Sequence, residues 1–396
     1  MKILVLGGCG IQGRTAVYDL SLDKNVDQII CADIGFDNLK KIEKFADMSK
    51  ITTLTLNALD KEALIAAFKK ADVVIDLLPK DFKKYVNEAA LQAKISMVNT
   101  NYFYDAEELD SQAKDAGIAI LPECGLDPGI DLIIYGDAKQ KFDELHVVNS
   151  YCGGFPEKKA CTNPLSYKLS WIWKGVLSSC MRDSRVINDK KLIEIPAMNQ
   201  HDTKYVHSID FPGLGELEAI PNGNAVYFTD LMGVSDTIIH TGRYSLRWPG
   251  WSAFWRPVKA LGFLSEEPVK GLACDVAPID FLDKLLGPQL EYKDDEKDLT
   301  AMINIFEGIQ SESTGDKKKI RFTSTMLIER DLDTGIMAMS KGVGYTASIA
   351  ARMIANGDIK EKGVLSPLKH IPFKKFKNEL KKRGIEIKEE TTVLEE

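Results

Sequence analysis

Three glycines directly behind an apolar run constrain the fold of this chain more than any other feature. The run Lys2–Leu6 is followed by Gly8, Gly10 and Gly13, and a helical pattern begins near Ile11. Between a strand and a helix, the first glycine permits a tight turn and the second lets the backbone approach a pyrophosphate. The third lets the helix pack closely on the strand. The stretch therefore predicts a dinucleotide-binding turn, and a tight turn without a ligand is the alternative.

The first third of the chain repeats an alternation of strand and helix patterns. Six short apolar runs, several of them β-branched, are separated by helical stretches. They are Lys2–Leu6, Gln28–Ala32, Ile51–Thr55, Asp72–Leu77, Ser96–Asn99 and Ile118–Leu121. Between the third and fourth runs, Asp60 is expected to cap a helix. Apolar strands alternating with helices are typical of parallel sheets covered on both faces. We therefore predict an α/β fold that begins with a Rossmann dinucleotide-binding domain.

An acid at the end of the second run supports this prediction. Asp33 stands where a carboxylate would hold the ribose hydroxyls of a dinucleotide. A carboxylate there repels the 2′-phosphate of NADP and no Arg follows directly, so NAD is favoured and NADP is the alternative. Further cofactor contacts are expected on the glycine turn and at the carboxyl ends of the strands. These residues are Ile11, Gln12, Asn57, Ala58, Leu78, Pro79, Thr100 and Leu126.

Composition and charge exclude several classes of protein. The chain has 396 residues, enough for two domains, and its net charge of −7 argues against binding to nucleic acid. No apolar run reaches the length of a membrane span, and the N-terminus lacks a signal-peptide pattern. We therefore expect a cytoplasmic protein that acts on small molecules. The seven cysteines form no C-x-x-C pair and the five histidines are scattered, so no metal site is predicted.

The regular alternation of strand and helix patterns ends after the sixth run. This change predicts a second domain. Leu145–Tyr151 is expected to be a strand, and Ile320–Glu329 is expected to form a hairpin with Ile336–Ser340 through the turn DLDTG. The basic run Lys374–Arg383 is expected to be a solvated helix that ends at Gly384. All five tryptophans lie in this part, at positions 171, 173, 248, 251 and 255. They fit a pocket wall or subunit interface, with an ordinary core as the alternative.

Longer stretches of the chain resemble the saccharopine dehydrogenase family. The most specific is PECGLDPGIDL at 122–132, and further matches follow in order along nearly the whole chain. They are YCGGFP at 151–156, NPLSYKLSW at 163–171, GRYSLRWPG at 242–250, GYTASIAARMIANGDIKEKGVLSP at 344–367 and KKRGIEIKEE at 381–390. The resemblance implies an oxidoreductase of lysine metabolism that uses a nicotinamide cofactor on a carbon–nitrogen bond. It also implies a homodimer.

The same resemblance implies how the domains are divided. A helix over Tyr345–Ala355 is expected to return to the nucleotide domain, which would then be discontinuous. The implied nucleotide-binding Rossmann domain comprises 1–129 with 343–365. The implied substrate-binding and dimerisation domain, of α+β type, comprises 130–342 with 366–396.

The resemblance further implies which side chains carry the chemistry. Asp127 matches a position that family members use at the substrate, although Asp-Pro-Gly is also a common turn. Asn101 and Tyr102 match a position that contacts both substrate and nicotinamide. For proton transfer, Asp127 is the first candidate, followed by Lys168 and Tyr102, with Cys152 as the family-matching thiol.

Substrate carboxylates are expected to bind to the stretch GRYSLRWPG. Arg243 and Arg247 can each hold a carboxylate in bidentate fashion, and Ser245 lies between them. The chain also departs from the family pattern. Fungal-type saccharopine reductases carry an Arg where this chain has Gly223, and a serine where it has Ile172. With these two residues, the pocket is less suited to a substrate with three carboxylates.

Three functions therefore stay open at this stage. The first is oxidative cleavage of saccharopine to glutamate and aminoadipate semialdehyde, or the reverse reaction. The second is oxidative deamination of lysine by a lysine 6-dehydrogenase, which acts on a smaller substrate. The third is a non-catalytic NAD-binding redox sensor. In the first two cases the partner is a small amino-acid substrate, and no nucleic acid or membrane partner is expected.

Overall fold

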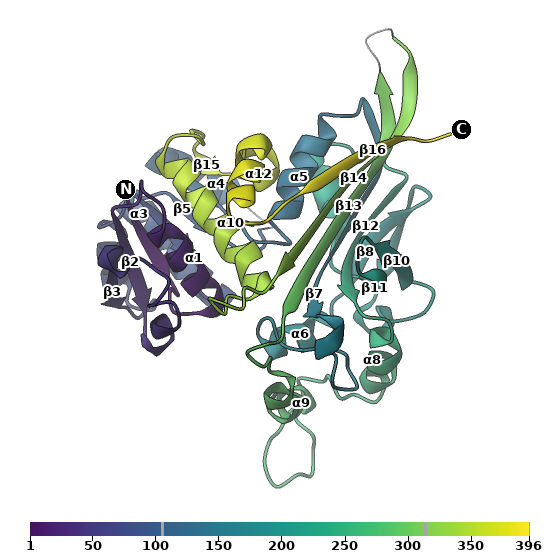
Figure 1. The fold of residues 1–396 in the computed structure, drawn as a ribbon, viewed down its shortest axis with the longest axis horizontal. Coiled ribbons are helices and arrows are strands. Elements are labelled where there is room, and N and C mark those ends of the chain that lie inside the picture. Colours follow the sequence, from purple (N-terminus) through teal and green to yellow (C-terminus); the bar gives the residue numbers. More distant parts are fainter. Residues whose placement is uncertain (104–106, 312–314, 396) are drawn as a thin grey trace. The chain divides into compact units, whose positions relative to one another are not determined.

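The computed structural model describes residues 1–103, 107–311 and 315–395. The chain forms two compact units, which Figure 1 shows as ribbons. Unit 1 comprises Met1–Gly136, Asp333–Ile336 and Ser340–Ile385, and unit 2 comprises Asp137–Leu332, Met337–Met339 and Glu386–Glu396. The domain limits given above stay a prediction. Among the described helices, none combines the length and the apolar character that a membrane span requires.

Unit 1 is built on a parallel sheet in the order β15-β6-β5-β4-β1-β2-β3. Its strands are β1 (Lys2–Leu6), β2 (Gln28–Asp33), β3 (Ile51–Thr55), β4 (Val73–Asp76), β5 (Met97–Asn99), β6 (Ala119–Leu121) and β15 (Gly363–Val364). All six predicted strands are confirmed. The strand order reverses between β1 and β4, as in a Rossmann fold, and such a switch point is where dinucleotides bind.

Several helices connect the strands of this sheet, and eight of the described helices lie wholly or mainly in unit 1. They are α1 (Ile11–Ser21), α2 (Lys61–Phe68), α3 (Lys83–Ala93), α4 (Glu107–Ala116), α5 (Ile130–Lys139), α10 (Ala338–Ala355), α11 (Pro367–His370) and α12 (Phe373–Lys382). Asp60 caps α2 as predicted, because its carboxylate accepts a hydrogen bond from the Ala63 amide at 3.0 Å. The predicted helix over 345–355 is confirmed as part of α10. At Gly344 it packs on α1 so closely that a Cβ atom would lie 2.9 Å from the Gln12 carbonyl oxygen.

Unit 2 contains a second, largely antiparallel sheet in the order β10-β11-β12-β7-β13-β14-β16, with β8 and β9 attached to β12. Its strands are β7 (Glu144–Pro156), β8 (Ser184–Asn188), β9 (Lys191–Ile195), β10 (His207–Phe211), β11 (Gly215–Pro221), β12 (His240–Arg247), β13 (Asp298–Ser311), β14 (Lys317–Glu329) and β16 (Lys388–Val393). The C-terminal strand β16 runs along the long strand β14 (Figure 1). The predicted strand over 145–151 is confirmed as part of β7.

Shorter elements complete the described fold. The helices of unit 2 are α6 (Trp173–Ser179), α7 (Ala225–Met232), α8 (Trp251–Ala260) and α9 (Pro278–Leu286). The 3₁₀ turns are η1 (Asp37–Lys41), η2 (Met48–Lys50), η3 (Lys80–Phe82), η4 (Lys158–Ala160), η5 (Ala197–Asn199) and η6 (Gly287–Leu290). Four of the five tryptophans are buried and Trp171 is half-buried. Since three of the buried ones belong to one core cluster with Tyr167, packing accounts for much of their concentration in this part of the chain.

The hairpin predicted between 320–329 and 336–340 is wrong. Strand β14 pairs with the preceding strand β13, and residues from Ala338 onward form α10. The carboxylate of Asp298 accepts hydrogen bonds from the backbone amides of Ala338 and Met339, at 2.8 and 3.2 Å. These bonds satisfy amides that a helix leaves open in its first turn. Because this cap comes from a residue 40 positions earlier, the local sequence pattern does not reveal it.

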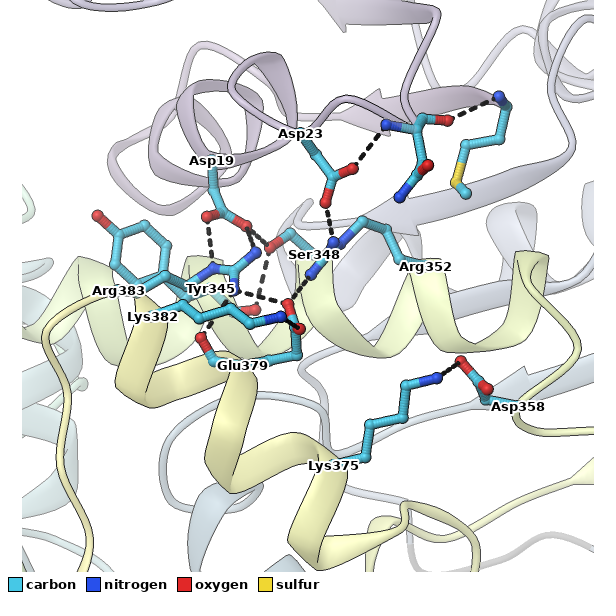
Figure 2. A network of polar contacts seen from close by, with 12 residues as sticks. Asp19, Asp23, Tyr345, Ser348, Arg352, Asp358, Lys375, Glu379, Lys382 and Arg383 are labelled. Carbon is cyan, nitrogen blue, oxygen red and sulfur yellow. Dashed lines mark hydrogen bonds and ion pairs between the residues drawn. The ribbon is translucent and has the colours of Figure 1, made fainter.

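The prediction of a solvated helix over 374–383 is wrong in part. Helix α12 occupies this stretch and Gly384 follows it with a positive φ of 74°. However, Phe376 and Leu380 are fully buried. Arg383 donates hydrogen bonds to both carboxylate oxygens of Asp19 on α1, at 2.5 and 3.0 Å. The helix is therefore anchored to the core of unit 1 on one face (Figure 2).

Candidate active site

The predicted glycine turn lies between β1 and α1, where steric contacts explain two of its glycines. A Cβ atom on Gly13 would lie 2.1 Å from the carbonyl oxygen of Gly7, so only glycine lets α1 approach the turn this closely. A Cβ atom on Gly8 would lie 2.6 Å from the sulfur of Cys31 on β2. The chain thus keeps both positions free of side chains for close packing.

Gly10 has a different role, at the N-terminus of α1. It is the N-cap residue, and it provides no side-chain cap for the helix. No acid lies in the first helical turn, so the amides of Ile11 and Gln12 face no competing carboxylate from that turn. Exposed first-turn amides and the helix dipole attract an anion. These features fit the pyrophosphate of a dinucleotide.

Asp33 ends β2, as the sequence predicts. One carboxylate oxygen accepts a hydrogen bond from the Cys9 amide at 2.9 Å, and the other accepts one from the Ile34 amide at 2.8 Å. The two bonds fix the acid against the glycine turn. Each carboxylate oxygen keeps a lone pair with which it could accept from a ribose hydroxyl.

The other predicted cofactor residues follow neighbouring strands of the same sheet. Asn57 and Ala58 follow β3, Leu78 and Pro79 follow β4, Thr100 follows β5 and Leu126 follows β6. The carboxyl ends of parallel strands meet at one edge of the sheet, so these residues belong to the edge that bears the glycine turn. The carboxylate of Asp76 accepts from the Leu78 amide at 3.1 Å and orients that segment. Burial raises the pKa of Asp76 to about 7.

The turn around Asp127 is held by its own backbone and by a buried acid. The Asp127–Pro128 peptide bond is cis. A Cβ atom on Gly129, whose φ is 150°, would lie 2.0 Å from the Gly125 carbonyl oxygen. Asp131 accepts a hydrogen bond from the Gly129 amide at 2.8 Å, and burial raises its pKa to about 7. Asp127 is half-buried in this rigid turn.

Backbone hydrogen bonds join the segments of Asn101 and Asp127. The Glu123 amide donates to the Asn101 carbonyl oxygen at 3.2 Å, and the Cys124 amide donates to the Asn99 carbonyl oxygen at 2.9 Å. The carbonyl oxygen of Tyr102 accepts from Lys83 at 3.3 Å. Within unit 1 the structure therefore brings together the strand ends that carry Asn101, Tyr102 and Asp127.

The candidates on strands β7 and β12 of unit 2 share one face of the sheet. Strands β7 and β12 run parallel, with Cys152 in register with Ser245 and Ser150 with Arg243. Since side chains alternate along a strand, Cys152, Arg243, Ser245 and Arg247 all belong to the same face. Cys152 and both arginines are buried.

Aromatic rings hold both arginines. The Arg243 guanidinium lies 4.3 Å from the ring centre of Phe228. That of Arg247 lies 5.2 Å from Tyr167 and 5.1 Å from Trp251, and it donates to the carbonyl oxygen of Leu246 at 2.7 Å. A guanidinium stacked in this way keeps further N–H groups with which to bind a carboxylate.

Lys168 is buried beside an acid. Its ammonium donates to the carboxylate of Glu296 at 2.5 Å, and both side chains are more than nine-tenths buried. The ion pair fixes the position of the Lys168 ammonium. It leaves no evident route by which Lys168 would exchange a proton with a substrate. We therefore rank Lys168 below Asp127 as a proton-transfer candidate.

Sequence reasoning missed two cations close to Arg247. Burial raises the pKa of the Cys180 thiol to about 11, while the charges of Arg247, Lys259 and Arg182 oppose that rise. Burial likewise lowers the pKa of His201 to about 3, and Lys259 and Arg247 lower it further. The three cations are therefore neighbours around Cys180. No local sequence pattern marks Lys259 or Arg182, because only folding brings them to Arg247.

The hydrogen-bond partners of these cations are neutral. The Lys259 ammonium donates to the carbonyl oxygens of Cys180 and Ala197, at 2.9 and 2.5 Å. Arg182 donates to the side-chain oxygen of Asn222 at 3.0 Å, beside Gly223. In the described part of the chain, none of the three cations forms an ion pair with a carboxylate. The cluster could therefore hold the carboxylates of a ligand.

Two family models match consecutive parts of the chain. The model for the saccharopine dehydrogenase NADP binding domain matches residues 3–121. The model for the saccharopine dehydrogenase C-terminal domain matches residues 125–385. The chain belongs to the saccharopine dehydrogenase family. Its Rossmann fold and its second domain thus follow the family pattern that the sequence motifs indicated.

Fungal members of the saccharopine dehydrogenase family match along their full length. Saccharopine dehydrogenase [NADP(+), L-glutamate-forming] of Pyricularia oryzae is 27% identical over 98% of each chain. That of Saccharomyces cerevisiae is 26% identical over 98% of this chain and 99% of its own. The solved apo structure of the L-Glu-forming enzyme from Saccharomyces cerevisiae has a TM-score of 0.84, with 23% identity and 99% coverage of both chains. The fold of the two proteins is therefore the same.

A mammalian member of the family is longer. The mitochondrial alpha-aminoadipic semialdehyde synthase of Mus musculus is 26% identical over 99% of this chain but only 48% of its own length. The chain thus spans about half the length of such relatives.

The expected cofactor class, NAD or NADP, is confirmed by the family model for NADP binding. The preference for NAD that Asp33 suggests stays a prediction. In the described residues, no group of three or more possible metal ligands converges.

Proposed function

We propose that this chain is an NAD(P)-dependent oxidoreductase that cleaves saccharopine oxidatively to glutamate and aminoadipate semialdehyde, or catalyses the reverse reaction. The observation that carries the proposal is the end-to-end match to the fungal saccharopine dehydrogenases, which covers 98% or more of those chains. The glycine turn, Asp33 and the strand-end residues of unit 1 would hold the dinucleotide. The basic face of unit 2 would bind substrate carboxylates.

The chemistry requires three tasks from the side chains. When bound, the nicotinamide accepts a hydride from the carbon next to nitrogen. The protein must align that carbon, take the proton of the amine and admit water to the resulting imine. Asp127 is our candidate for holding the amine and its proton, since its turn is rigid. Tyr102 and Cys152 are the further candidates, and Asn101, Arg243, Ser245 and Arg247 are candidates for binding the substrate.

The absence of ion pairs between the three neighbouring cations of unit 2 and carboxylates of the described residues favours saccharopine over lysine. Saccharopine carries three carboxylates and lysine carries one. A buried charge without an ion-pair partner costs several kcal/mol, so Arg247 and Lys259 favour an anionic ligand. Gly223 and Ile172 are the observations that favour lysine 6-dehydrogenase, because each replaces a polar family residue. Arg182 lies beside Gly223 and could supply the missing guanidinium.

A substrate screen tests the proposal directly. Absorbance of the reduced nicotinamide is followed with saccharopine or lysine, each with NAD and with NADP. We expect a kcat/KM for saccharopine at least about tenfold above that for lysine, which corresponds to about 1.4 kcal/mol. A higher value for lysine would identify a lysine 6-dehydrogenase. Measurable cofactor binding without turnover of any substrate would favour the redox sensor.

We also propose that the protein works as a cytoplasmic homodimer. The family resemblance supports the dimer. Light scattering on the purified protein would give a mass of about twice 44.1 kDa for the dimer. A mass of a single chain at all concentrations would contradict it.

A further inference from the structure

A cavity lies in unit 2, on the sheet face opposite the proposed substrate residues of β7 and β12. Its volume is about 360 Å³. Its floor is formed by Tyr151 on β7 and Tyr244 on β12, which are in register with each other. The next register pair is Cys152 with Ser245. Because side chains alternate along a strand, the two tyrosines point away from the face that carries Cys152 and Ser245.

Aromatic and apolar side chains line this cavity. The rings of Tyr151 and Tyr244 are stacked, with centres 4.8 Å apart and planes 14° apart. His207 stands edge-on to both, with its Nε2 atom 3.3 Å from the Tyr151 hydroxyl. The β8–β9 hairpin adds apolar walls, including Ile193 and Ile195. Ligand pockets in proteins typically begin at about 300 Å³ and have walls of this composition.

The polar groups in the lining favour a negatively charged ligand. They include Lys204, His207, His240 and the side-chain amides of Asn149 and Asn188. No Asp or Glu belongs to the described lining. Asp189 lies 3.5 Å from His240 at the hairpin but does not belong to the lining. The cavity therefore offers a cation and neutral donors to a carboxylate, but no acid within its lining to hold an ammonium group.

We propose that this cavity binds a small, planar aromatic carboxylic acid that carries no amino group. The aromatic ring lies against the two tyrosines, and the carboxylate is held near Lys204. Burial lowers the pKa of the His207 imidazole, and its hydrogen bond to the Tyr205 backbone opposes this shift. The site is separate from the proposed dehydrogenase site and needs neither its cofactor nor its substrate.

Titration calorimetry on the full chain, with indole-3-acetate as the probe and no cofactor present, tests the proposal. The variant Ile193→Trp fills the cavity and should weaken binding at least about tenfold. The matched control is Leu192→Trp on the same strand, because Leu192 is 49% exposed and does not belong to the cavity lining. It should leave the affinity within about twofold of the unchanged chain. Absence of binding at millimolar probe, or equal affinity in Ile193→Trp, would overturn the proposal.

Charge selection is tested separately with a surface variant that should not disturb folding. Indole-3-acetamide and tryptophan have the same ring, but the first lacks the negative charge and the second adds an ammonium group. Both should bind more weakly than indole-3-acetate. In Lys204→Gln the acid should lose at least about threefold in affinity, whereas the amide should be unaffected. Equal binding of acid, amide and tryptophan to the unchanged chain would refute the proposed ligand class. Turnover of saccharopine is a separate measurement, so the two proposals can fail independently.

Discussion

At the scale of single residues, the cations near Cys180 give the sharpest constraint on the substrate. Lys259 is 2% exposed, and burial lowers its pKa to about 8. Asp202 is the acid whose charge partly opposes this shift. The ammonium is therefore charged below about pH 8 and loses its proton above it. A substrate carboxylate held by Lys259 would bind more weakly on the alkaline side.

We predict that KM for saccharopine rises above about pH 8 and that Lys259→Met removes this rise. At pH 7 the variant should raise KM roughly tenfold or more, as expected for the loss of a charge-assisted hydrogen bond. Steady-state kinetics between pH 6 and 10 measure both effects. Lys174→Met is the control, because the Lys174 side chain is half exposed on α6. An unchanged alkaline rise in Lys259→Met would exclude Lys259 from substrate binding.

A second residue-scale prediction concerns the cofactor. Asp33→Ala removes the acid that is fixed by the Cys9 and Ile34 amides. We expect NAD to bind about tenfold more weakly, since the ribose loses a charge-assisted hydrogen bond, while NADP binding is retained or improved. Calorimetry with each dinucleotide measures this difference. Asp37→Ala is a suitable control, because the Asp37 side chain is almost fully exposed. If NAD affinity is the same in Asp33→Ala, this acid does not contact the ribose.

A third prediction concerns the proposed proton carrier. Asp127→Ala should lower kcat at least about a hundredfold, because general acid–base groups contribute on this scale. The dinucleotide should still bind, since the glycine turn is untouched. Asp127→Asn tests whether the carboxylate or only the turn matters, because Asn also suits such turns. Turnover near the normal rate in Asp127→Asn would show that this position serves the turn alone.

At the scale of elements, ion pairs as well as apolar burial hold α12 in its position in unit 1. Glu379 on α12 accepts hydrogen bonds from Arg352 on α10 at 2.6 Å and from Arg383 at 3.0 Å (Figure 2). Arg352 also pairs with Asp23, which lies just beyond α1. Burial opposes ionisation of Glu379, but the bonds from Lys382, Arg352 and Arg383 lower its pKa to about 2.

This network predicts a pH-dependent stability. Because the folded pKa of Glu379 is below its ordinary value of 4.5, its stabilisation is complete above about pH 4.5 and disappears as pH falls through about 2. Glu379→Gln should lower the free energy of unfolding by roughly 2–4 kcal/mol at pH 7. Urea unfolding at pH 7 and pH 3 should give a smaller difference at pH 3. Glu390→Gln on exposed β16 is the control, and an equal loss in both variants would contradict the prediction.

Elements whose signals are local were predictable from the sequence. The strands and helices around the glycine turn alternate in short, regular units, and Asp60 caps α2 from its own sequence neighbourhood. The hairpin prediction failed because a turn signal says nothing about which distant strand competes for pairing. Strand β14 pairs with β13 over its whole length, and the cap from Asp298 commits Ala338 to a helix.

At the scale of the whole molecule, each of the two units combines segments that are far apart in the chain. Strand β15 and helices α10 and α12 join a unit that begins at residue 1, and β16 joins the sheet of the other. Such long-range pairings carry a loop-closure cost that is recovered only by the contacts they complete. Patterns within a single stretch contain no record of these partners.

The sequence by itself determined the parallel nucleotide-binding sheet, the glycine turn with Asp33 at its side, and membership of the family through the Gly-Leu-Asp-Pro-Gly stretch. These features depend on residues that are neighbours along the chain. Only the tertiary structure decided that Arg182, Lys259 and Arg247 gather around Cys180, and that α12 is anchored by buried ion pairs. Electrostatic and packing partners are chosen by distance in space, which the linear order of residues does not specify.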